Sequence, residues 1–490
     1  MMSAGETRFA RLVAGMFFAV SLAKLFTHEP WRDEWGPWGI ALASDGLRQL
    51  WRALPYEGHA RFWYFLVFAL ERVTGRFESV QLVTAVFATV AVWVVARFAP
   101  FPRWARVLFA VGYYPLFEYG SIARPYSIEL AATCVAAAVF CRARRAPLPL
   151  AVALVVLAQT TIYGVILAAA FGVAWLADLW RAAPGDRALP SHSWIAAGIV
   201  GVSMVAAVAQ MVPPSDSTFA RGWRTKLEPS RVARVVATVT RGVTPLPRPQ
   251  VHFWNTHVLD GSPRVECAVG AAMLLVFSLL FVRSPSALLL WIVATAGLLA
   301  FEYIKYEGYA RHQGHFFLAF LAAAWLAMEA QRAAGAKNNV VASLGLAVLA
   351  VVLVVNAAGG LLAVAVDWTF PFSTATAAAQ TLRRRGLAEL PAVGRRGSTT
   401  AAVAAVLGRP IVLAGTGRTS TFVSWDHTYR VPSLPRATEE ARRLAATSGS
   451  AVLLILDTPL VKLPRRVEWL ASMAEPIVRD EQFHIYVVQP

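Results

Sequence analysis

The amino-acid sequence predicts a polytopic α-helical membrane protein with a soluble α/β domain at its C-terminus. Apolar and aromatic residues, counting Cys and Tyr, make up 57% of the 490 positions, and the mean hydropathy is +0.52. Only 15% of the residues are charged, whereas about 25% are charged in an ordinary soluble domain. This composition excludes a single soluble globular domain and a disordered chain, and three cysteines are too few for a disulfide scaffold.

Eleven apolar segments approach the length that a bilayer-spanning helix requires, which is about 20 residues. They lie at residues 9–26, 79–97, 105–121, 125–141, 147–162, 163–180, 194–212, 264–282, 285–302, 313–330 and 339–363. The division of the long run 147–180 into two helices follows the polar residues Gln159, Thr160 and Thr161. We expect the first segment to be a retained helix with its N-terminus inside, because no clean signal-peptide cleavage site follows it.

The distribution of Lys and Arg predicts the orientation of these helices. If the short apolar stretch 61–75 does not cross the membrane, the basic residues of short loops fall mainly on the inside. The inside set is Arg8, Arg11, Arg97, Arg103, Arg106, Arg142, Arg144, Arg145, Arg181, Arg187, Arg283, Arg332 and Lys337, and the outside set is Arg124, Lys305 and Arg311. Residues 61–75 are rich in Phe, Trp and Tyr, so we expect them to lie at the outer interface or to re-enter the membrane.

The chain is strongly basic, with 46 Lys and Arg against 29 Asp and Glu and a formal net charge of +17. The basic residues are scattered through short loops rather than gathered in one block, so nucleic acid is not an expected partner. These cations suit anionic head groups and lipid phosphates, and membrane lipids are therefore expected partners.

This topology divides the chain into a transmembrane module, residues 1–366, and an outer C-terminal domain, residues 367–490. The module has two large outer segments, 27–78 and 213–263, of which the second either covers a site or lies at the interface. In the C-terminal domain, helix patterns at 373–386, 436–447 and 466–474 alternate with strand patterns at 411–414, 451–456 and 484–488. The alternation is typical of a layered α/β domain. Residues 418–426 are interpreted as a loop or an edge strand.

The first outer segment contains two adjacent carboxylates, Asp33 and Glu34, just past the end of the first predicted helix. A carboxylate at this position can act as a general base or bind a divalent metal such as Mg²⁺ or Mn²⁺. The alternative is a solvated loop whose flanking residues, Trp31 and Trp35, lie at the interface.

Two more polar segments lie at predicted outer ends. Glu57 and His59 precede the stretch 61–75, and Arg124, Tyr126 and Glu129 surround the start of the fourth predicted helix. Ionisable residues at or inside membrane segments are costly and therefore tend to be functional. A structural pair of Arg124 and Glu129 is the alternative.

The densest polar cluster at the end of a predicted span covers residues 302–315 and includes Lys305, Arg311 and His312. It faces the same side as Asp33. An aromatic and basic interface belt is the alternative. His312 and His315 are three residues apart and can share a helix face, but they lack an obvious carboxylate partner beyond Glu307, and we assign no metal ligand.

These segments, in this order, resemble the polytopic GT-C glycosyltransferases that use polyprenyl-phosphate sugars. The likeness is strongest to the bacterial aminoarabinose transferases and the protein O-mannosyltransferases, and it covers about residues 1–210. Asp33-Glu34 matches the acidic site of the family's first outer loop, and 56–75 matches its re-entrant stretch. Residues 119–129 and 159–164 match its next two outer turns. Two lysines of the aminoarabinose enzymes are replaced, one by Gly58-His59 and one by Thr and Ile.

The resemblance implies an inverting transfer of a hexosyl or pentosyl unit from a polyprenyl-phosphate donor to a lipid, glycan or protein acceptor. The reaction is expected on the outer face of the plasma (inner) membrane, with Asp33 as the base and Glu34 as the second candidate. The expected substrate-binding residues are Glu57, His59, Arg124, Tyr126, Glu129, Lys305, Arg311 and His312. Arg124, His59, Lys305, Arg311 and His312 are the candidate cations for the lipid phosphate.

The sequence leaves metal dependence, by Mg²⁺ or Mn²⁺, open. Two functions from other classes are also open. One is a transporter or flippase of a cell-envelope glycolipid precursor, although no internal repeat supports it. The other is a sensor or assembly scaffold whose C-terminal domain binds a partner.

Overall fold

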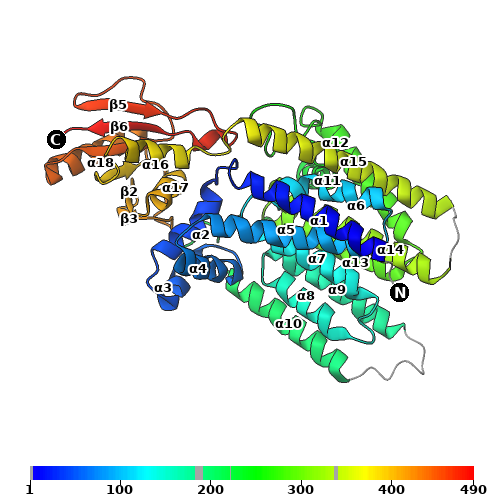
Figure 1. The fold of residues 1–490 in the computed structure, drawn as a ribbon. Coiled ribbons are helices and arrows are strands. Elements are labelled where there is room, and N and C mark those ends of the chain that lie inside the picture. The colour runs from blue at the N-terminus through cyan, green and yellow to red at the C-terminus, as the bar shows by residue number, and fades with distance from the viewer. Residues whose placement is uncertain (1–3, 182–190, 221, 336–339) are drawn as a thin grey trace.

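The computed structural model describes residues 4–181, 191–220, 222–335 and 340–490. It consists of an elongated bundle of helices and a small domain with a β-sheet at one end of that bundle (Figure 1). The bundle helices are α1 (Ala4–Lys24), α5 (Glu78–Phe98), α6 (Arg103–Ala110), α7 (Tyr126–Phe140), α8 (Pro147–Ala158), α9 (Ile162–Trp180), α10 (Ser191–Met211), α11 (Pro229–Val243), α12 (Pro263–Phe281), α13 (Pro285–Ile304), α14 (Ala310–Ala333) and α15 (Val340–Thr369). We call the remaining C-terminal part, residues 370–490, the sheet domain.

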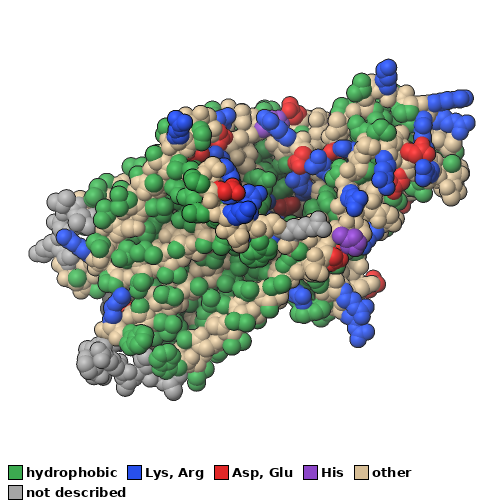
Figure 2. Space-filling model, turned by 180° about the vertical axis from the view of Figure 1, so that it is seen from behind, with side chains coloured by type: hydrophobic (Ala, Val, Ile, Leu, Met, Phe, Trp, Pro, Cys, Tyr) green, Lys and Arg blue, Asp and Glu red, His purple; other side chains and the backbone are tan. Residues whose placement is uncertain are grey.

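Seven of the described helices are long and apolar enough to cross a membrane: α5, α9, α10, α12, α13, α14 and α15. Apolar side chains cover much of the bundle surface, whereas charged side chains gather toward the sheet domain (Figure 2). Helices α10 and α12 bury only a small part of their apolar surface within the protein. Such helices require a lipid environment, and the chain is therefore a membrane-embedded helical protein.

The other predicted spans form shorter or more polar helices. Helices α7 and α8 have 15 and 12 residues. The prediction of one continuous helix over 105–121 is wrong, because α6 ends at Ala110 and the separate π-helix η2 (Tyr114–Glu118) follows. Pro115 explains the interruption, since it lacks the N–H that a continuous α-helix needs.

Prolines mark the starts of four bundle helices. Pro147, Pro229, Pro263 and Pro285 stand in the first turn of α8, α11, α12 and α13. The missing N–H costs nothing there, because the first N–H groups of a helix have no partner within it. Helix α11 lies within the segment 213–263, where the sequence analysis predicted no helix.

Several basic residues predicted to lie inside meet at the end of the bundle away from the sheet domain. Arg106 at the start of α6 pairs with Glu6 in the first turn of α1, 2.7 Å apart. Arg144, just past α7, pairs with Asp178 near the end of α9, 2.6 Å apart. The N-terminus lies at this same end (Figure 1). Arg187 and Lys337 lie outside the described residues.

A layer of short helices lies between the bundle and the sheet domain (Figure 1). It contains α2 (Arg32–Leu42), α3 (Leu47–Ala53), the 3₁₀ turn η1 (Leu54–Tyr56) and α4 (Phe62–Thr74). Helix α4, which is the apolar stretch singled out in the sequence, has 13 residues and lies outside the long bundle. Its residues Trp63 and Val67 belong to one buried apolar cluster with Trp38 of α2.

The sheet domain has six strands in the order β3-β2-β1-β4-β6-β5. The strands are β1 (Ala392–Gly394), β2 (Ile411–Leu413), β3 (Arg418–Ser420), β4 (Val452–Leu456), β5 (Val467–Ser472) and β6 (His484–Val488). Strand β1 runs parallel to β2 and β4, and the other neighbours are antiparallel. The helices of the domain are α16 (Ala375–Arg384), α17 (Gly397–Leu407) and α18 (Leu434–Ser448).

Most of the predicted elements of this domain are confirmed. Strands β2, β4 and β6 match the three strand patterns, α16 and α18 match two helix patterns, and β3 is an edge strand within 418–426. The helix predicted at 466–474 is wrong, because residues 467–472 form strand β5 along the free edge of β6. Pairing with β6 supplies backbone hydrogen bonds that the short local pattern does not reveal.

The sheet domain is fixed to α2 by close backbone contact. Gly39 of α2 lies so near the sheet domain that an added Cβ would come within 2.3 Å of the Thr421 carbonyl oxygen. The Thr421 hydroxyl donates to the Gly39 carbonyl oxygen at 2.7 Å. Only glycine permits this approach, and the contact places the sheet domain directly beside Asp33.

Candidate functional site

A pocket of about 130 Å³ lies between the short-helix layer, the bundle and the sheet domain. Its polar lining includes Asp33 from α2, Glu57 and His59 from the loop before α4, and Arg124 from the turn before α7. Four residues predicted from three separate segments therefore meet in one cavity. Phe422 and other apolar residues of the sheet domain form part of the opposite wall.

The Asp33 carboxylate is surrounded by guanidinium groups. Arg311 Nη2 and Arg124 Nη1 lie 3.4 and 3.9 Å from Asp33 Oδ2, and Arg32 Nε lies 4.0 Å from Asp33 Oδ1. Burial acts to raise the pKa of Asp33, but the charges of Arg124, Arg311 and Arg32 outweigh it and lower this pKa below its usual value. The carboxylate is therefore ionised at neutral pH, and 28% of the side chain is exposed.

The Arg124 side chain is held at the pocket by the backbone carbonyl of Asp33 and by His59. Its Nη1 donates to the Asp33 carbonyl oxygen at 2.6 Å, and its Nη2 lies 3.5 Å from His59 Nε2. The Nε of this buried side chain has no hydrogen-bond partner within the described chain. A buried N–H of a cation without a partner is costly, which makes Arg124 a candidate for contact with an anion.

Arg311, in the first turn of α14, contacts the Asp33 carboxylate at 3.4 Å and is surrounded by aromatic side chains. Its guanidinium carbon lies 5.2 Å from the ring of Trp31, 5.6 Å from that of Trp254 and 5.2 Å from that of Tyr309. Stacking on aromatic faces suits a planar guanidinium, and Nη2 still donates to Asp33 Oδ2. The predicted Arg311 is therefore part of the site, and Trp254 joins it.

The pKa values of Glu57 and His59 both depart strongly from their usual values. Burial raises the pKa of Glu57 to about 7, although the Tyr64 hydroxyl donates to this carboxylate at 2.9 Å. Burial lowers the pKa of His59 to about 3, and the charge of Arg124 acts in the same direction. A neutral imidazole at physiological pH follows from this pKa, which does not favour the predicted role of His59 as a cation.

Glu34 has a different environment from its neighbour Asp33. It is 1% exposed, and its Oε1 accepts a hydrogen bond from the Ala123 N–H at 2.6 Å. Its Oε2 accepts from the Trp31 N–H at 3.0 Å and lies 3.3 Å from His28 Nε2. These contacts join the segment that carries Asp33 to the segment that carries Arg124, so the geometry favours a positioning role for Glu34 rather than that of a base.

Glu129 belongs to a separate, fully buried group. Its Oε2 lies 2.5 Å from His315 Nε2, and its Oε1 accepts from the Thr161 hydroxyl at 2.5 Å. These contacts join α7, α9 and α14. The alternative interpretation, a structural pair of Arg124 and Glu129, is wrong, because Glu129 contacts His315 and Thr161 and links helices inside the bundle.

His312 and Tyr126 lie between the pocket and this buried group. His312 Nδ1 accepts a hydrogen bond from the Tyr309 N–H at 3.0 Å, and its ring stacks on Tyr163 with 5.1 Å between ring centroids. His315 stacks on the same tyrosine at 4.9 Å, so the two histidines do share one face of α14. The Tyr126 hydroxyl is buried and has no hydrogen-bond partner within the described chain.

Lys305 lies elsewhere. Its ammonium group donates to the Phe219 carbonyl oxygen at 2.6 Å and lies 4.8 Å from the Trp223 ring centroid. It therefore anchors the segment after α10 to the end of α13, and it does not line the Asp33 pocket.

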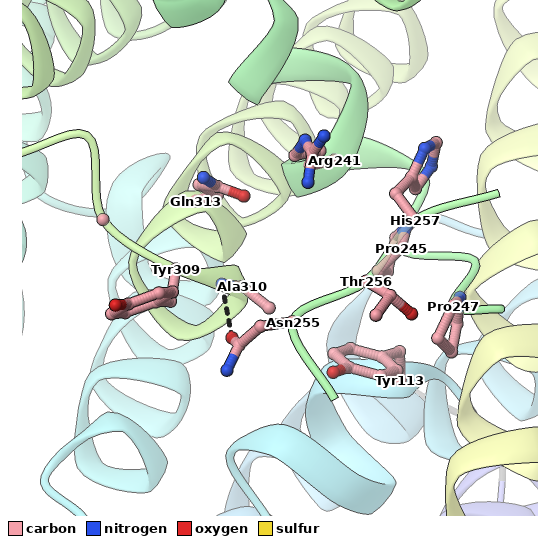
Figure 3. Close-up of a pocket in the computed structure, with 11 residues that line it drawn as sticks. Tyr113, Arg241, Pro245, Pro247, Asn255, Thr256, His257, Tyr309, Ala310 and Gln313 are labelled. Atoms are coloured by element: carbon pink, nitrogen blue, oxygen red, sulfur yellow. Dashed lines mark hydrogen bonds between the residues drawn. The ribbon is translucent and has the colours of Figure 1, made fainter. Parts of the chain in front are cut away.

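A second, smaller cavity of about 60 Å³ lies on another side of the start of α14 (Figure 3). Asn255 Oδ1 accepts a hydrogen bond from the Ala310 N–H there at 3.3 Å. Its charged member, Arg241, is paired with Asp260 at 2.8 Å and with Glu266 at 2.7 Å. None of the predicted site residues lines this cavity, so we place the candidate site at Asp33.

The donor groups at the site do not fit a divalent metal. Asp33 is surrounded by guanidinium groups, Glu34 is committed to His28 and two N–H groups, and Glu129 is committed to His315. Within the described parts of the chain, no three His, Cys, Asp or Glu residues are grouped so that they could hold a metal ion. We therefore derive no step that uses a metal.

The sequence analysis missed His28, Asp367 and Lys24, which form a buried charged group around Glu34, the neighbour of Asp33. His28 lies between Glu34 and Asp367 of α15, and its Nδ1 is 3.0 Å from Asp367 Oδ1. Lys24 Nζ lies 3.8 Å from Asp367 Oδ2. The signal was present in part, because Asp367 ends a long apolar run, and a carboxylate there requires a partner.

Neither a scan of protein-family models nor a search of curated proteins gives a match to this chain. The functional argument therefore depends on the geometry around Asp33.

Proposed function

We propose that this protein is an inverting glycosyltransferase that moves a sugar from a polyprenyl-phosphate donor to an acceptor hydroxyl. The observation that supports this function best is the ionised Asp33 carboxylate between Arg124 and Arg311, in a pocket at one end of a membrane bundle. This arrangement combines a base with cations suited to phosphate, next to the surface where a lipid-linked phosphate lies.

Asp33 supplies the base. As the acceptor oxygen attacks the anomeric carbon, its proton passes to the Asp33 carboxylate. The bond between that carbon and the phosphate oxygen breaks, and the lipid phosphate leaves with the electron pair. Attack from the side opposite the leaving group inverts the configuration of the sugar. The lowered pKa of Asp33 keeps it in the required ionised form.

Arg124 and Arg311 stabilise the leaving phosphate. Their guanidinium groups pair with the Asp33 carboxylate, with N–O distances of 3.9 and 3.4 Å. The donor phosphate is a diester with one negative charge, and its oxygens compete with Asp33 for both guanidinium groups through charge-assisted hydrogen bonds. The lipid phosphate that leaves gains a second negative charge, so the two guanidinium groups stabilise it more strongly than the bound donor. Binding of the donor then frees Asp33 to accept the proton of the acceptor.

The membrane arrangement is part of the same proposal. We propose eleven spans in a GT-C arrangement, with α1, the shorter helices α7 and α8 and the α6–η2 segment added to the seven long apolar helices. The pocket and the sheet domain then face the outer side of the plasma membrane. The positive-inside rule supports this orientation, because Arg106 of α6 and Arg144 of the turn after α7 lie at the opposite end.

The test compares lipid extracts by mass spectrometry from cells lacking the gene and from cells rescued with wild type, Asp33→Asn or Asp45→Asn. Asp45 is an exposed residue after α2 and provides the matched control. We expect a polyprenyl-phosphate sugar to accumulate in the null and Asp33→Asn strains alone. Equal lipid-linked sugars in all strains, with a persistent null phenotype, would refute the transferase and favour transport or scaffolding.

A further inference from the structure

One wall of the Asp33 pocket belongs to the sheet domain, and it is fixed at both ends. At one end, Thr421 bonds to Gly39 of α2. At the other end, the Trp425 carbonyl oxygen accepts a hydrogen bond from the Thr218 N–H at 2.8 Å. The wall formed by residues 421–425 is therefore built into the fold by two elements of the membrane module, and it faces the candidate base.

This wall is aromatic, whereas the facing wall is charged. Phe422 and Trp425 line the pocket from the sheet domain, and Phe219 lines it from the segment after α10. The rings of Phe219 and Trp425 are 5.6 Å apart. Asp33 and Arg124 line the same cavity on the membrane-module side.

We infer that the wall 421–425, together with Phe219, is the acceptor subsite and that the acceptor presents a sugar ring. This inference rests on the proposed function and names the substrate class of the same pocket. A sugar ring is amphipathic, with C–H groups on its faces and hydroxyl groups around its edge. The C–H groups carry partial positive charge and pack on the negative face of an aromatic ring, while Asp33 accepts the proton of one hydroxyl.

The lining favours a sugar over a lipid tail or an unmodified peptide. An acyl chain needs a continuous apolar lining, because burying charge without a polar partner is costly, and here five ionisable side chains face the aromatic wall. An extended peptide is usually recognised along a free sheet edge or in a long groove. The pocket is compact, at about 130 Å³, and residues 421–425 follow the edge strand β3 without extending it.

The test measures binding of the purified full-length chain in detergent to an array of unlipidated oligosaccharides and a matched array of unglycosylated peptides. The variants are Trp425→Ala, Trp425→Phe and Phe219→Ala. Trp469→Ala is the control, because Trp469 is 58% exposed on β5, at the sheet edge opposite β3. Phe219 is 41% exposed and outside the domain core, so its variant tests the wall even if Trp425→Ala does not fold.

We expect wild type and Trp469→Ala to bind oligosaccharides equally and Trp425→Ala and Phe219→Ala to bind them about tenfold more weakly. Trp425→Phe keeps an aromatic face and should lose no more than about threefold. Undiminished binding by Phe219→Ala and folded Trp425→Ala, or binding of wild type to peptides alone or to neither array, overturns the inference. Oligosaccharide binding that depends on Trp425, combined with unchanged lipid-linked sugars in the Asp33→Asn strain, supports a carbohydrate site and refutes only the transfer reaction.

Discussion

Replacing His28 by glutamine tests whether the buried ion pairs of His28 with Glu34 and Asp367 stabilise the contact between α2 and α15. The His28 ring is 1% exposed and lies between two carboxylates, 3.0 Å from Asp367 and 3.3 Å from Glu34. Burial acts to lower the pKa of His28, but Asp367 and Glu34 outweigh it and raise this pKa to about 10. The ring is therefore a cation at neutral pH and neutralises both carboxylates.

The contribution of His28 to the free energy of unfolding follows from the difference between its pKa in the unfolded and in the folded chain. A rise from 6.5 to about 10 corresponds to roughly 5 kcal/mol of stabilisation. Because the folded pKa is the higher one, this contribution is complete below pH 6.5 and is lost as the pH rises through 10. In His28→Gln, Asp367 keeps Lys24 as a partner at 3.8 Å, whereas Glu34 loses the one ion pair that it makes among the described residues. Breaking such a buried pair costs about 3–5 kcal/mol.

The assay is thermal unfolding of the purified full-length chain in detergent, at pH 6 and at pH 10.5. We expect the Tm of His28→Gln to lie several degrees below that of wild type at pH 6 and the difference to shrink at pH 10.5. His427→Gln is the control, because His427 is 69% exposed beside Asp216, and exposed pairs contribute little. Equal Tm values at pH 6, or a difference that is undiminished at pH 10.5, would refute a protonated His28 between the carboxylates.

Three more predictions concern the site and its wall. Arg311→Lys keeps the charge but loses the planar stacking on tryptophan. We expect transferase activity in the rescued null strain to fall about 10- to 100-fold, and wild-type activity would contradict the role of Arg311. Because the pKa of Glu57 in the folded chain is raised to about 7, the stability of the protein falls as the pH rises from 4.5 to 7. Glu57→Gln should therefore reduce the slope of Tm against pH in this range, and an unchanged slope would refute the raised pKa. Gly39→Ala forces its Cβ onto the Thr421 carbonyl at a cost of about 1–3 kcal/mol and should expose the sheet domain to protease, whereas Gly36→Ala, with open space around its Cβ, should not.

The sequence predicted the membrane class and the run of helices because both depend on local properties. Apolar runs such as α13 and α15 are hydrophobic on all sides, and such segments need no tertiary information to be recognised. Two of the errors arose where tertiary contacts decide. The segment 467–472 became a strand by pairing with β6, and α11 formed within a segment interpreted as a loop.

The candidate site was predicted only in part for the same reason. Asp33 and Arg124 were identifiable as ionisable residues near the ends of apolar segments. The sequence analysis ranked Asp33 above Glu34 as the base but kept both as candidates, since the two carboxylates are adjacent and chemically alike. Their environments separate them, because Glu34 is buried against His28 and N–H groups while Asp33 lines the pocket.

The sequence by itself determined that this chain lies in a membrane and that its polar residues concentrate at the ends of apolar helices, because the cost of burying charge in lipid acts on each segment separately. Only the tertiary structure decided which of those residues share a cavity. It brought Arg311 to Asp33 across 278 positions of sequence and placed Thr421 of the sheet domain against Gly39. Such contacts depend on the packing of distant elements, which no local pattern of residues encodes.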